Sequence, residues 1–431
     1  MRRLDTARLG AAGVAKALAR PPAGVDAEVH RRVEEILAAV REKGDAALLE
    51  FTERFDRVRL TAGELAVSSA EMDAALGAVG EATVRALRYA AERIERFHRE
   101  CAPRSWRMTD ALGSRLGQEV RPLDRVAVYV PGGRAAYPST VLMTVIPARV
   151  AGVREIVLVS PPRGDKSLDP AVLAAARVAG ITEAYRVGGA QAVAALAYGT
   201  ATIAAVAKIV GPGNAYVAAA KRLVFGKVGI DMIAGPSEVL ILADKTGHAE
   251  WIAADLLAQA EHDASAQPIL ITDDAALADE VEKAVGAQLG SLPRAAIAAA
   301  SWRDFGAIIL VGGLDEAVPL VDAIAPEHLE IVSEDAERLA ERICNAGAIF
   351  LGAHTPEAIG DYVAGSNHVL PTARSARFSS GLGVLDFMKR TSILKCGPDQ
   401  LRALGPAAIA LGEAEGLDGH ARSVMMRFNP R

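Results

Sequence analysis

The chain has 431 residues, of which 51% are hydrophobic and 23% charged, and this predicts two or three globular domains and excludes a disordered or collagen-like protein. Its 48 basic and 53 acidic residues leave a net charge of -5, and no block of five or more like charges occurs. This balance disfavours a nucleic-acid partner and a polybasic membrane contact.

The cysteines and the N-terminus predict a cytoplasmic setting. Cys101, Cys344 and Cys396 lie far apart and form no CxxC pair, which is typical of a reducing compartment. The first ten residues carry two arginines, but the apolar segment of a secretory signal does not follow. The uncharged stretch 187–207 could span a bilayer by length, yet its glycines, threonines and glutamine favour a buried helix between turns.

Near the N-terminus, residues 26–52 and 70–100 show apolar side chains at helical spacing, with charged residues between them. Val29, Val33 and Ile36 are examples of this spacing. The pattern predicts amphipathic helices that cover one face of a sheet.

From about residue 125, short β-branched runs alternate with segments rich in Ala and Leu, which predicts parallel sheets covered by helices. The first series has predicted strands at 126–130, 155–160, 183–187 and 208–210, and predicted helices at 141–151, 170–179, 190–198 and 215–225. After a break at Gly235-Pro236, the second series has predicted strands at 239–243, 269–272, 307–311, 329–332 and 348–351, and predicted helices at 249–262, 275–288, 315–324, 335–344 and 356–363. Two such series predict two sheets or one unusually wide sheet. Beyond residue 377 the pattern weakens, and the remaining segment is too short for a core of its own.

Two glycine-rich turns follow predicted strands of the first series, where doubly wound sheets place ligands. They are YVPGGR at 129–134 and GPGN at 211–214, and the backbone N–H groups of the second could meet a phosphate at a helix start. Neither matches the GxGxxG fingerprint, because Tyr216 occupies the third glycine position of the second turn. The acidic residue that usually anchors a ribose is replaced by Ser160-Pro161-Pro162. The turns alone leave nucleotide binding and a purely structural role equally open.

The histidines are few, so their neighbourhoods are informative. Four of the eight lie in charged or loop-like contexts typical of solvated side chains: His30, His98, His248 and His354. Gln259 and His262 lie three residues apart near the end of a predicted helix and can point to one ligand. Because the cysteines are scattered, a metal site must use His, carboxylate or amide ligands. A helix-end histidine that interacts with the helix dipole would explain the pair equally well.

Other candidate residues lie in loops and at strand starts. Glu327 and His328, in APEHLE, combine a carboxylate and an imidazole suited to general acid and base catalysis, although a surface helix end is the alternative. Asp361 lies on the short predicted helix 356–363, and His368 and His420 lie in loop-rich segments around it in the sequence.

The junction between the two series carries a hydroxyl, that of Ser237 in GPSE, where pockets often form. The sequence contains neither HExxH nor GxSxG, so the zinc-protease and hydrolase signatures are missing.

Seven motifs, taken together, resemble the histidinol dehydrogenase family. They are YVPGG at 129–133, VGGAQA at 187–192, GPGN at 211–214, AGPSE at 234–238, QAEHD at 259–263, APEHLE at 325–330 and GSNH at 365–368. They occur in order, and the resemblance runs from about residue 25 to residue 420. It implies an NAD- and zinc-dependent enzyme, with one zinc per subunit, that oxidises L-histidinol to L-histidine through L-histidinal in the last steps of histidine biosynthesis.

The resemblance also implies residue roles, motif by motif. The zinc ligands would be Gln259, His262, Asp361 and His420. The catalytic pair would be Glu327, which activates water, and His328, which takes the alcohol proton. The NAD contacts would be Tyr129, Gln191 and Asn214. The substrate contacts would be the four zinc ligands together with Ser237, His328, His368 and Glu415.

The two βα series and the resemblance together predict an α/β fold with two Rossmann-like βαβ domains, both lacking GxGxxG, N-terminal helices and a small C-terminal tail. Residues 1–120 are expected to form a helical region packed on the second α/β domain. Residues 121–236 are expected to bind NAD, and residues 237–380 to carry the catalytic and metal residues. Residues 381–431 are expected to be exchanged with the partner in a homodimer that shares its active sites. No nucleic-acid or membrane partner is expected.

Three other functions remain open. A relative with the same scaffold could oxidise another amino alcohol or a sulfonated alcohol. A zinc-assisted hydrolase or lyase could use the same ligands without a nicotinamide, and a duplicated α/β protein could bind a ligand without catalysis. The sequence does not decide between NAD and NADP, or between zinc and manganese or cobalt.

Overall fold

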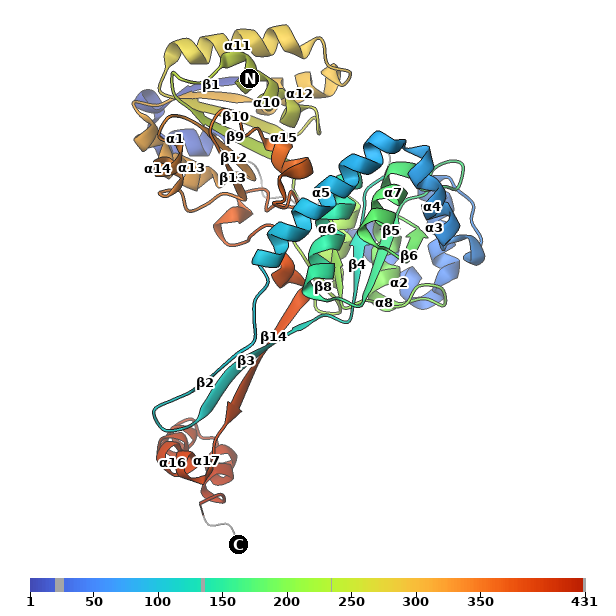
Figure 1. The fold of residues 1–431 in the computed structure, drawn as a ribbon, viewed down its shortest axis with the longest axis vertical. Coiled ribbons are helices and arrows are strands. Elements are labelled where there is room, and N and C mark those ends of the chain that lie inside the picture. The colour runs from blue at the N-terminus through green and yellow to red at the C-terminus, as the bar shows by residue number, and fades with distance from the viewer. Residues whose placement is uncertain (20–26, 133–135, 234, 429–431) are drawn as a thin grey trace. The chain divides into compact units, whose positions relative to one another are not determined.

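The computed structural model describes residues 1–19, 27–132, 136–233 and 235–428. The chain forms two units: Met1–Cys101 with Asp124–Phe387, and Ala102–Leu123 with Met388–Arg431. The first unit contains two sheets of parallel strands, each covered by helices (Figure 1). This confirms the predicted α/β fold. Gly133 and Arg134 of the first glycine turn and Ala234 of AGPSE lie outside the described residues. Among the residues described, no helix is both long and apolar enough to cross a membrane.

The first sheet has the strand order β6-β5-β4-β7-β8, so the order reverses between β4 and β7. Its strands are β4 (Arg125–Tyr129), β5 (Glu155–Ser160), β6 (Glu183–Arg186), β7 (Lys208–Val210) and β8 (Gly229–Ile230). Its connecting helices are α6 (Pro138–Ala151), α7 (Pro170–Ala179), α8 (Gly189–Tyr198) and α9 (Ala215–Val224). This is the strand order of a Rossmann half extended by two strands, and ligands bind such sheets where the order reverses.

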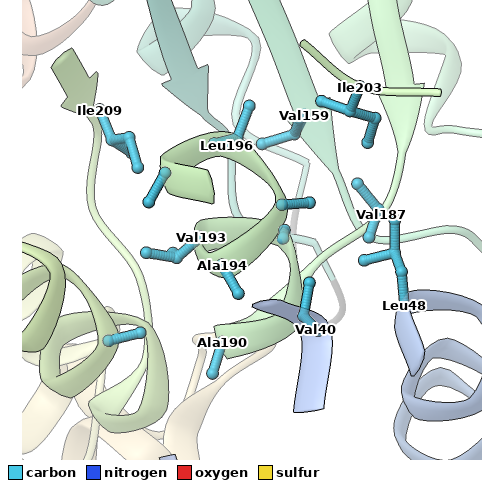
Figure 2. Packing of buried hydrophobic residues seen from close by; sticks show 14 of the residues in the cluster. Val40, Leu48, Val159, Val187, Ala190, Val193, Ala194, Leu196, Ile203 and Ile209 are labelled. Carbon is cyan, nitrogen blue, oxygen red and sulfur yellow. The ribbon is translucent and has the colours of Figure 1, made fainter. Parts of the chain in front are cut away.

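Local signals set the ends of these helices. At α7, the side chain of Asp169 accepts a hydrogen bond from Ala171 N, Pro170 occupies the first turn, and Gly180 ends the helix at a φ of 83°. Helix α8 is rich in alanine and is buried on nearly all sides. Figure 2 shows its Val193 and Leu196 in the core with Ile209 and Val159. Each fully buried aliphatic side chain contributes about 1.5 to 3 kcal/mol to stability.

The second sheet has the order β1-β11-β10-β9-β12-β13, and all its strands are parallel. Its strands are β1 (Arg2–Asp5), β9 (Glu238–Ala243), β10 (Gln267–Thr272), β11 (Ala307–Leu310), β12 (His328–Val332) and β13 (Ala348–Leu351). Its helices are α1 (Thr6–Ala17), α10 (Ala249–Ala260), α11 (Ala275–Leu289), α12 (Ala295–Phe305), α13 (Leu314–Ile324), α14 (Ala336–Ala340) and α15 (Glu357–Ile359), the last followed by the π-helical turn η2 (Gly360–Ala364). Five of the strands repeat the order of the first sheet, and β1 extends the edge beyond β11.

The predicted packing of residues 1–120 on the second domain is wrong for most of that region. Helices α2 (Ala27–Lys43), α3 (Asp45–Asp56), α4 (Ser69–Ala78) and α5 (Glu81–Glu100) contact the helices of the first sheet. Val33 and Val40, for example, share a core cluster with Val157 and Leu196. Of the described N-terminal elements, β1 pairs with β11 of the second sheet and α1 packs on its helix α13. Amphipathic spacing reveals an apolar face, and it does not reveal which sheet that face covers.

The second unit combines two segments that are distant in sequence. Strands β2 (Trp106–Thr109), β3 (Arg115–Pro122) and β14 (Met388–Lys395) form an antiparallel sheet of order β14-β3-β2. Helices α16 (Pro398–Ala414) and α17 (Asp418–Met425) pack on each other (Figure 1). The predicted boundaries at 120 and 381 therefore differ from the structure, because residues 102–123 pair with the tail and residues 381–387 belong to the first unit. Short 3-10 turns occur at Ala62–Glu64, Ser375–Arg377 and Val384–Phe387.

Candidate active site

The predicted catalytic pair lies at the amino end of β12, beside the amino end of β9 in the second sheet. His328 is the first residue of β12 and pairs with Val239 of β9, so Glu327 and Glu238 precede this pair side by side. The glycine turns of the first sheet, in contrast, follow the carboxyl ends of its strands. Glu327 and His328 are only 6% and 3% exposed. Both side chains are therefore shielded from water. Electrostatic interactions between such buried groups are stronger than in water.

Glu327 is held by the backbone of β9. The N–H of Glu238 donates to Glu327 Oε2 at 2.8 Å. Burial raises the pKa of Glu327 to about 8, although the nearby His328 and this N–H donor both favour the ionised form. A carboxyl group with a pKa near neutrality is suited to proton transfer in catalysis.

His328 is oriented by the same residue. Its Nδ1 lies 3.1 Å from the carbonyl oxygen of Glu238, which can only accept, so Nδ1 carries the proton of this hydrogen bond. Nε2 lies 3.4 Å from Asp361 Oδ1, beyond the usual N–H···O range, and has no hydrogen-bond partner within the described part of the chain. Burial lowers the pKa of His328, but the carboxyl groups of Glu357, Glu327 and Asp361 outweigh burial and raise this pKa well above its ordinary value.

Gln259 lies in the last turn of α10, and His262 lies in the turn that follows the helix, which ends two residues earlier than predicted. With its amide nitrogen turned toward Glu357, Gln259 donates to Glu357 Oε1 at 2.6 Å and to Oε2 at 3.0 Å. The amide oxygen of Gln259 then remains as an acceptor. His262 is exposed, yet desolvation by the surrounding protein lowers its pKa, so the ring is neutral near pH 7 and can offer a lone pair.

Asp361 lies on the π-helical turn η2, a distortion that recurs at functional sites. Burial raises the pKa of Asp361, but the imidazoles of His328, His368 and His262 outweigh burial and lower it below its ordinary value. His368 donates from Nδ1 to Asp361 O at 2.9 Å, and its Nε2 lies 3.3 Å from Thr140 Oγ1. Both nitrogens of His368 are thus occupied by protein groups, so its predicted substrate contact stays a prediction.

These donors suit a divalent metal ion. A neutral imidazole, an ionised carboxylate and an amide oxygen form an N/O set of the kind zinc accepts. Among the described residues, the group whose ligand atoms lie within 4.8 Å of one another is a different one, His328, Glu357 and Asp361, and it shares only Asp361 with the predicted zinc ligands. The fourth predicted zinc ligand, His420, lies on α17, and Glu415 follows α16, so both belong to the second unit. Ser237 immediately precedes β9, next to Glu238.

Sequence reasoning missed two buried carboxyl groups behind His328. Glu330, two residues along β12 and therefore on the same face as His328, accepts from Glu357 N at 2.6 Å. Side chains two residues apart on a strand share a face, so the motif APEHLE could have identified Glu330. No local pattern indicates Glu357, which lies on α15, after β13. His98 was predicted to be solvated, and this is wrong, because it is 2% exposed on α5.

The three predicted NAD-contacting residues lie at the carboxyl ends of the first sheet. Tyr129 ends β4, and its hydroxyl accepts from Gly189 N at 3.0 Å, at the start of α8. Gln191, in the first turn of α8, is 1% exposed, and its Oε1 has no partner among the described residues. Asn214 caps α9 by accepting from Tyr216 N at 3.0 Å and Val217 N at 3.1 Å. An unsatisfied buried oxygen beside two backbone turns fits a polar ligand such as a nucleotide.

Pro161 occupies the position after β5 where other Rossmann domains carry the acidic residue that binds the ribose. A Cβ on Gly132 would lie 2.8 Å from Pro161 Cγ, and a Cβ on Gly188 would lie 2.6 Å from Pro161 Cβ. The glycines therefore let the turns after β4 and β6 close around a proline at the position where other Rossmann domains carry an acid.

Comparison with known proteins gives one consistent result. The family model described as histidinol dehydrogenase matches residues 19–428. Histidinol dehydrogenase of Bradyrhizobium diazoefficiens is 68% identical over 405 residues, covering 94% of each chain. That of Rhodopseudomonas palustris is 65% identical over 429 residues, covering 100% of this chain and 99% of the relative. The crystal structure of histidinol dehydrogenase from Elizabethkingia anophelis superposes with a TM-score of 0.94 at 36% identity, covering 99% and 98%. The chain belongs to the histidinol dehydrogenase family.

Proposed function

We propose that the protein oxidises L-histidinol to L-histidine through L-histidinal, the last steps of histidine biosynthesis, with NAD as oxidant and one zinc ion per subunit. The observation that carries the proposal is the buried pair of Glu327 and His328, in which His328 Nε2 lies 3.4 Å from Asp361 Oδ1 and has no hydrogen-bond partner among the described residues. Family membership supports the reaction, and the donor set supports the metal.

His328 is the base of the alcohol step. Its Nδ1 proton is engaged by Glu238 O, so the ring in its unprotonated form presents the Nε2 lone pair to a substrate hydroxyl. The surrounding carboxyl groups raise its pKa, and this makes the ring a stronger base. After it takes the proton, the imidazolium is stabilised by Glu357 and Asp361, whose oxygens lie 3.5 and 3.4 Å from its nitrogens.

Glu327 is the base of the aldehyde step. A water molecule must add to the aldehyde before a second hydride can leave, and a carboxylate that accepts the water proton speeds that addition. The raised pKa of Glu327 makes its carboxylate more basic than an exposed one. The hydrogen bond from Glu238 N to Glu327 Oε2 holds the carboxylate in place.

The cofactors would be held by residues of both sheets. Gln259, His262, Asp361 and His420 would ligate zinc, and Tyr129, Gln191 and Asn214 would contact NAD. When bound, zinc would orient the nitrogens of the substrate and NAD would accept each hydride.

Substrate binding would involve both units of the chain. Ser237, His368 and Glu415 would contact histidinol together with His328 and the zinc ligands. Because His420 and Glu415 belong to the second unit, we propose a homodimer in which this unit completes the active site of the partner.

We place the reaction in the cytoplasm, consistent with three exposed free cysteines, and propose no nucleic-acid or membrane partner.

A substrate panel tests the reaction. Zinc-loaded protein with NAD and L-histidinol should form L-histidine, identified by mass spectrometry, and other amino alcohols and sulfonated alcohols at equal concentration should react far more slowly. Faster turnover of another alcohol would favour the altered-substrate alternative. Hydrolysis of an ester or amide without any dependence on NAD would favour the zinc hydrolase.

A further inference from the structure

A buried ion pair encloses the start of the second glycine turn. Lys221 on α9 and Asp231, which follows β8, form an ion pair whose side chains are 3% and 1% exposed. Asp231 Oδ2 accepts from Gly211 N at 2.7 Å, and Lys221 Nζ donates to Gly211 O at 2.9 Å. The two side chains together satisfy both backbone polar groups of a single residue.

Gly211 is the residue that joins this turn to the rest of the first sheet. Its φ is 111°, and a Cβ there would collide with the carbonyl oxygen of Tyr129. Three residues later, Asn214 caps α9 through its Oδ1, which leaves its amide N–H groups as donors. The position of Gly211 therefore sets the position of Asn214 relative to Tyr129, at the point where the strand order reverses between β4 and β7.

Stability alone does not account for an ion pair in this place. Removing two charges from water costs about as much as their attraction returns, so apolar side chains of similar volume usually serve a core as well or better. A polar pair is needed where the backbone groups of a turn must be held at a defined position while they are shielded from water.

We propose that Lys221 and Asp231 are positioning residues for NAD, which hold the turn 211–214 so that Asn214 and Tyr129 meet the dinucleotide together. This inference rests on the proposed NAD dependence. Neither side chain touches the reacting atoms, so their loss should weaken NAD binding and leave the chemistry and histidinol binding unchanged.

Steady-state kinetics of paired substitutions tests the proposal. In the zinc-loaded protein, Lys221→Met/Asp231→Leu removes both hydrogen bonds to Gly211 without leaving a lone buried charge. We expect the KM for NAD to rise roughly tenfold, with kcat and the KM for histidinol within about twofold of wild type. Lys221→Gln/Asp231→Asn keeps a donor and an acceptor for Gly211 and should restore the KM for NAD. If the first variant does not fold, Lys221→Met/Asp231→Asn, which loses only the bond to Gly211 O, should show the same pattern at roughly threefold.

The matched control is an ion pair at the opposite end of the same sheet. Arg125 and Glu183, the first residues of β4 and β6, pair at 2.6 Å, and Arg125→Met/Glu183→Leu should leave the KM for NAD unchanged. An unchanged KM for NAD in folded Lys221→Met/Asp231→Leu would overturn the inference, as would an equal rise in the control. If instead the wild-type protein formed no NADH from histidinol, the proposed function would fail, and the inference with it.

Discussion

At the scale of single residues, the backbone of Glu238 organises both members of the catalytic pair. Its N–H donates to Glu327 and its carbonyl oxygen accepts from His328. The register between β9 and β12 places these groups side by side, so the orientation of two side chains depends on main-chain pairing. Such groups stay fixed because moving them would break the sheet.

The two members of the pair should be separable by substitution. We expect His328→Asn to slow oxidation of L-histidinol by about 10² to 10⁴-fold, because the alcohol step loses its base. Glu327→Gln should slow oxidation of L-histidinal by a similar factor and retain part of the alcohol step. Single-turnover rates measured separately with each substrate check this, and equal losses in both steps for both variants would contradict the assignment.

The metal site should fail without loss of the fold. His262 is exposed at the end of α10, so His262→Asn removes a ligand and leaves the core intact. We expect the purified variant to hold much less than one zinc per subunit, to bind histidinol weakly, and to keep the wild-type Tm of the metal-free protein. Metal analysis and thermal unfolding measure both quantities, and stoichiometric zinc in the variant would count against the ligand assignment.

Much of the candidate site could be proposed from residue types and motifs, but the buried carboxyl groups that lie near His328 could not. Gln259 lies in the last turn of α10 and His262 follows in the turn after it, and Glu327 and His328 are neighbours, so local spacing brings each pair together. Glu357 contacts His328 only because β13 pairs with β12 and the chain then turns back. No local pattern encodes such a contact, because it depends on the register between strands that are distant in sequence.

At the scale of elements, helix α5 of the N-terminal region contacts the segment that carries Asp361. Arg93 on α5 donates to Val363 O at 2.8 Å and to Ala364 O at 3.1 Å, at the end of η2. Farther along the same helix, His98 is buried, and neither ring nitrogen has a partner among the described residues. Burial lowers the pKa of His98 to about 4.

This histidine should make the stability of the protein depend on pH. Between pH 6.5 and 4 the unfolded chain binds a proton at His98 that the folded chain excludes, so stability falls as the pH falls through this window. The difference between 6.5 and about 4 corresponds to about 3 kcal/mol at the acid end. Between pH 6.5 and 4, we expect the unfolding free energy of the wild-type protein to fall by about 3 kcal/mol more than that of His98→Phe. Urea unfolding at both pH values checks this, with the exposed His354→Phe as the control. Identical pH dependence in wild type and His98→Phe would refute it.

The parallel strands were predictable, and the elements of the second unit were not. Most strands of the two parallel sheets are rich in apolar residues, as in the fully buried β9, where residues 239–243 are all apolar. Strand β14, in contrast, is exposed along nearly its whole length, so its sequence shows neither an apolar run nor alternation. Helix α16 contains Pro406, which argues against a helix when only the sequence is read. Helix α12 was missed in an alanine-rich segment without a clear apolar face.

At the scale of the whole molecule, the predicted ligands are divided between two units of the chain. Gln259, His262 and Asp361 belong to the first unit, and His420 to the second. In the proposed homodimer, each active site combines the first unit of one subunit with the second unit of its partner.

Mixing two inactive variants tests this sharing. His262→Asn and His420→Asn should each be inactive alone. If the sites are shared, a random mixture contains half heterodimers, each with one intact site, so we expect about a quarter of wild-type activity after the two are refolded together. If each chain forms its own site, every site carries a defect and the mixture stays inactive, which would contradict the shared homodimer.

The most direct test of the proposed four-electron oxidation is the yield of NADH from a limiting amount of L-histidinol, measured with and without a strong chelator. The proposed function requires two NADH per histidinol, loss of the reaction on chelation and recovery on addition of zinc. One NADH per histidinol would show that the aldehyde is released and that Glu327 does not serve a second oxidation. No NADH from folded, zinc-loaded protein would contradict the proposed function.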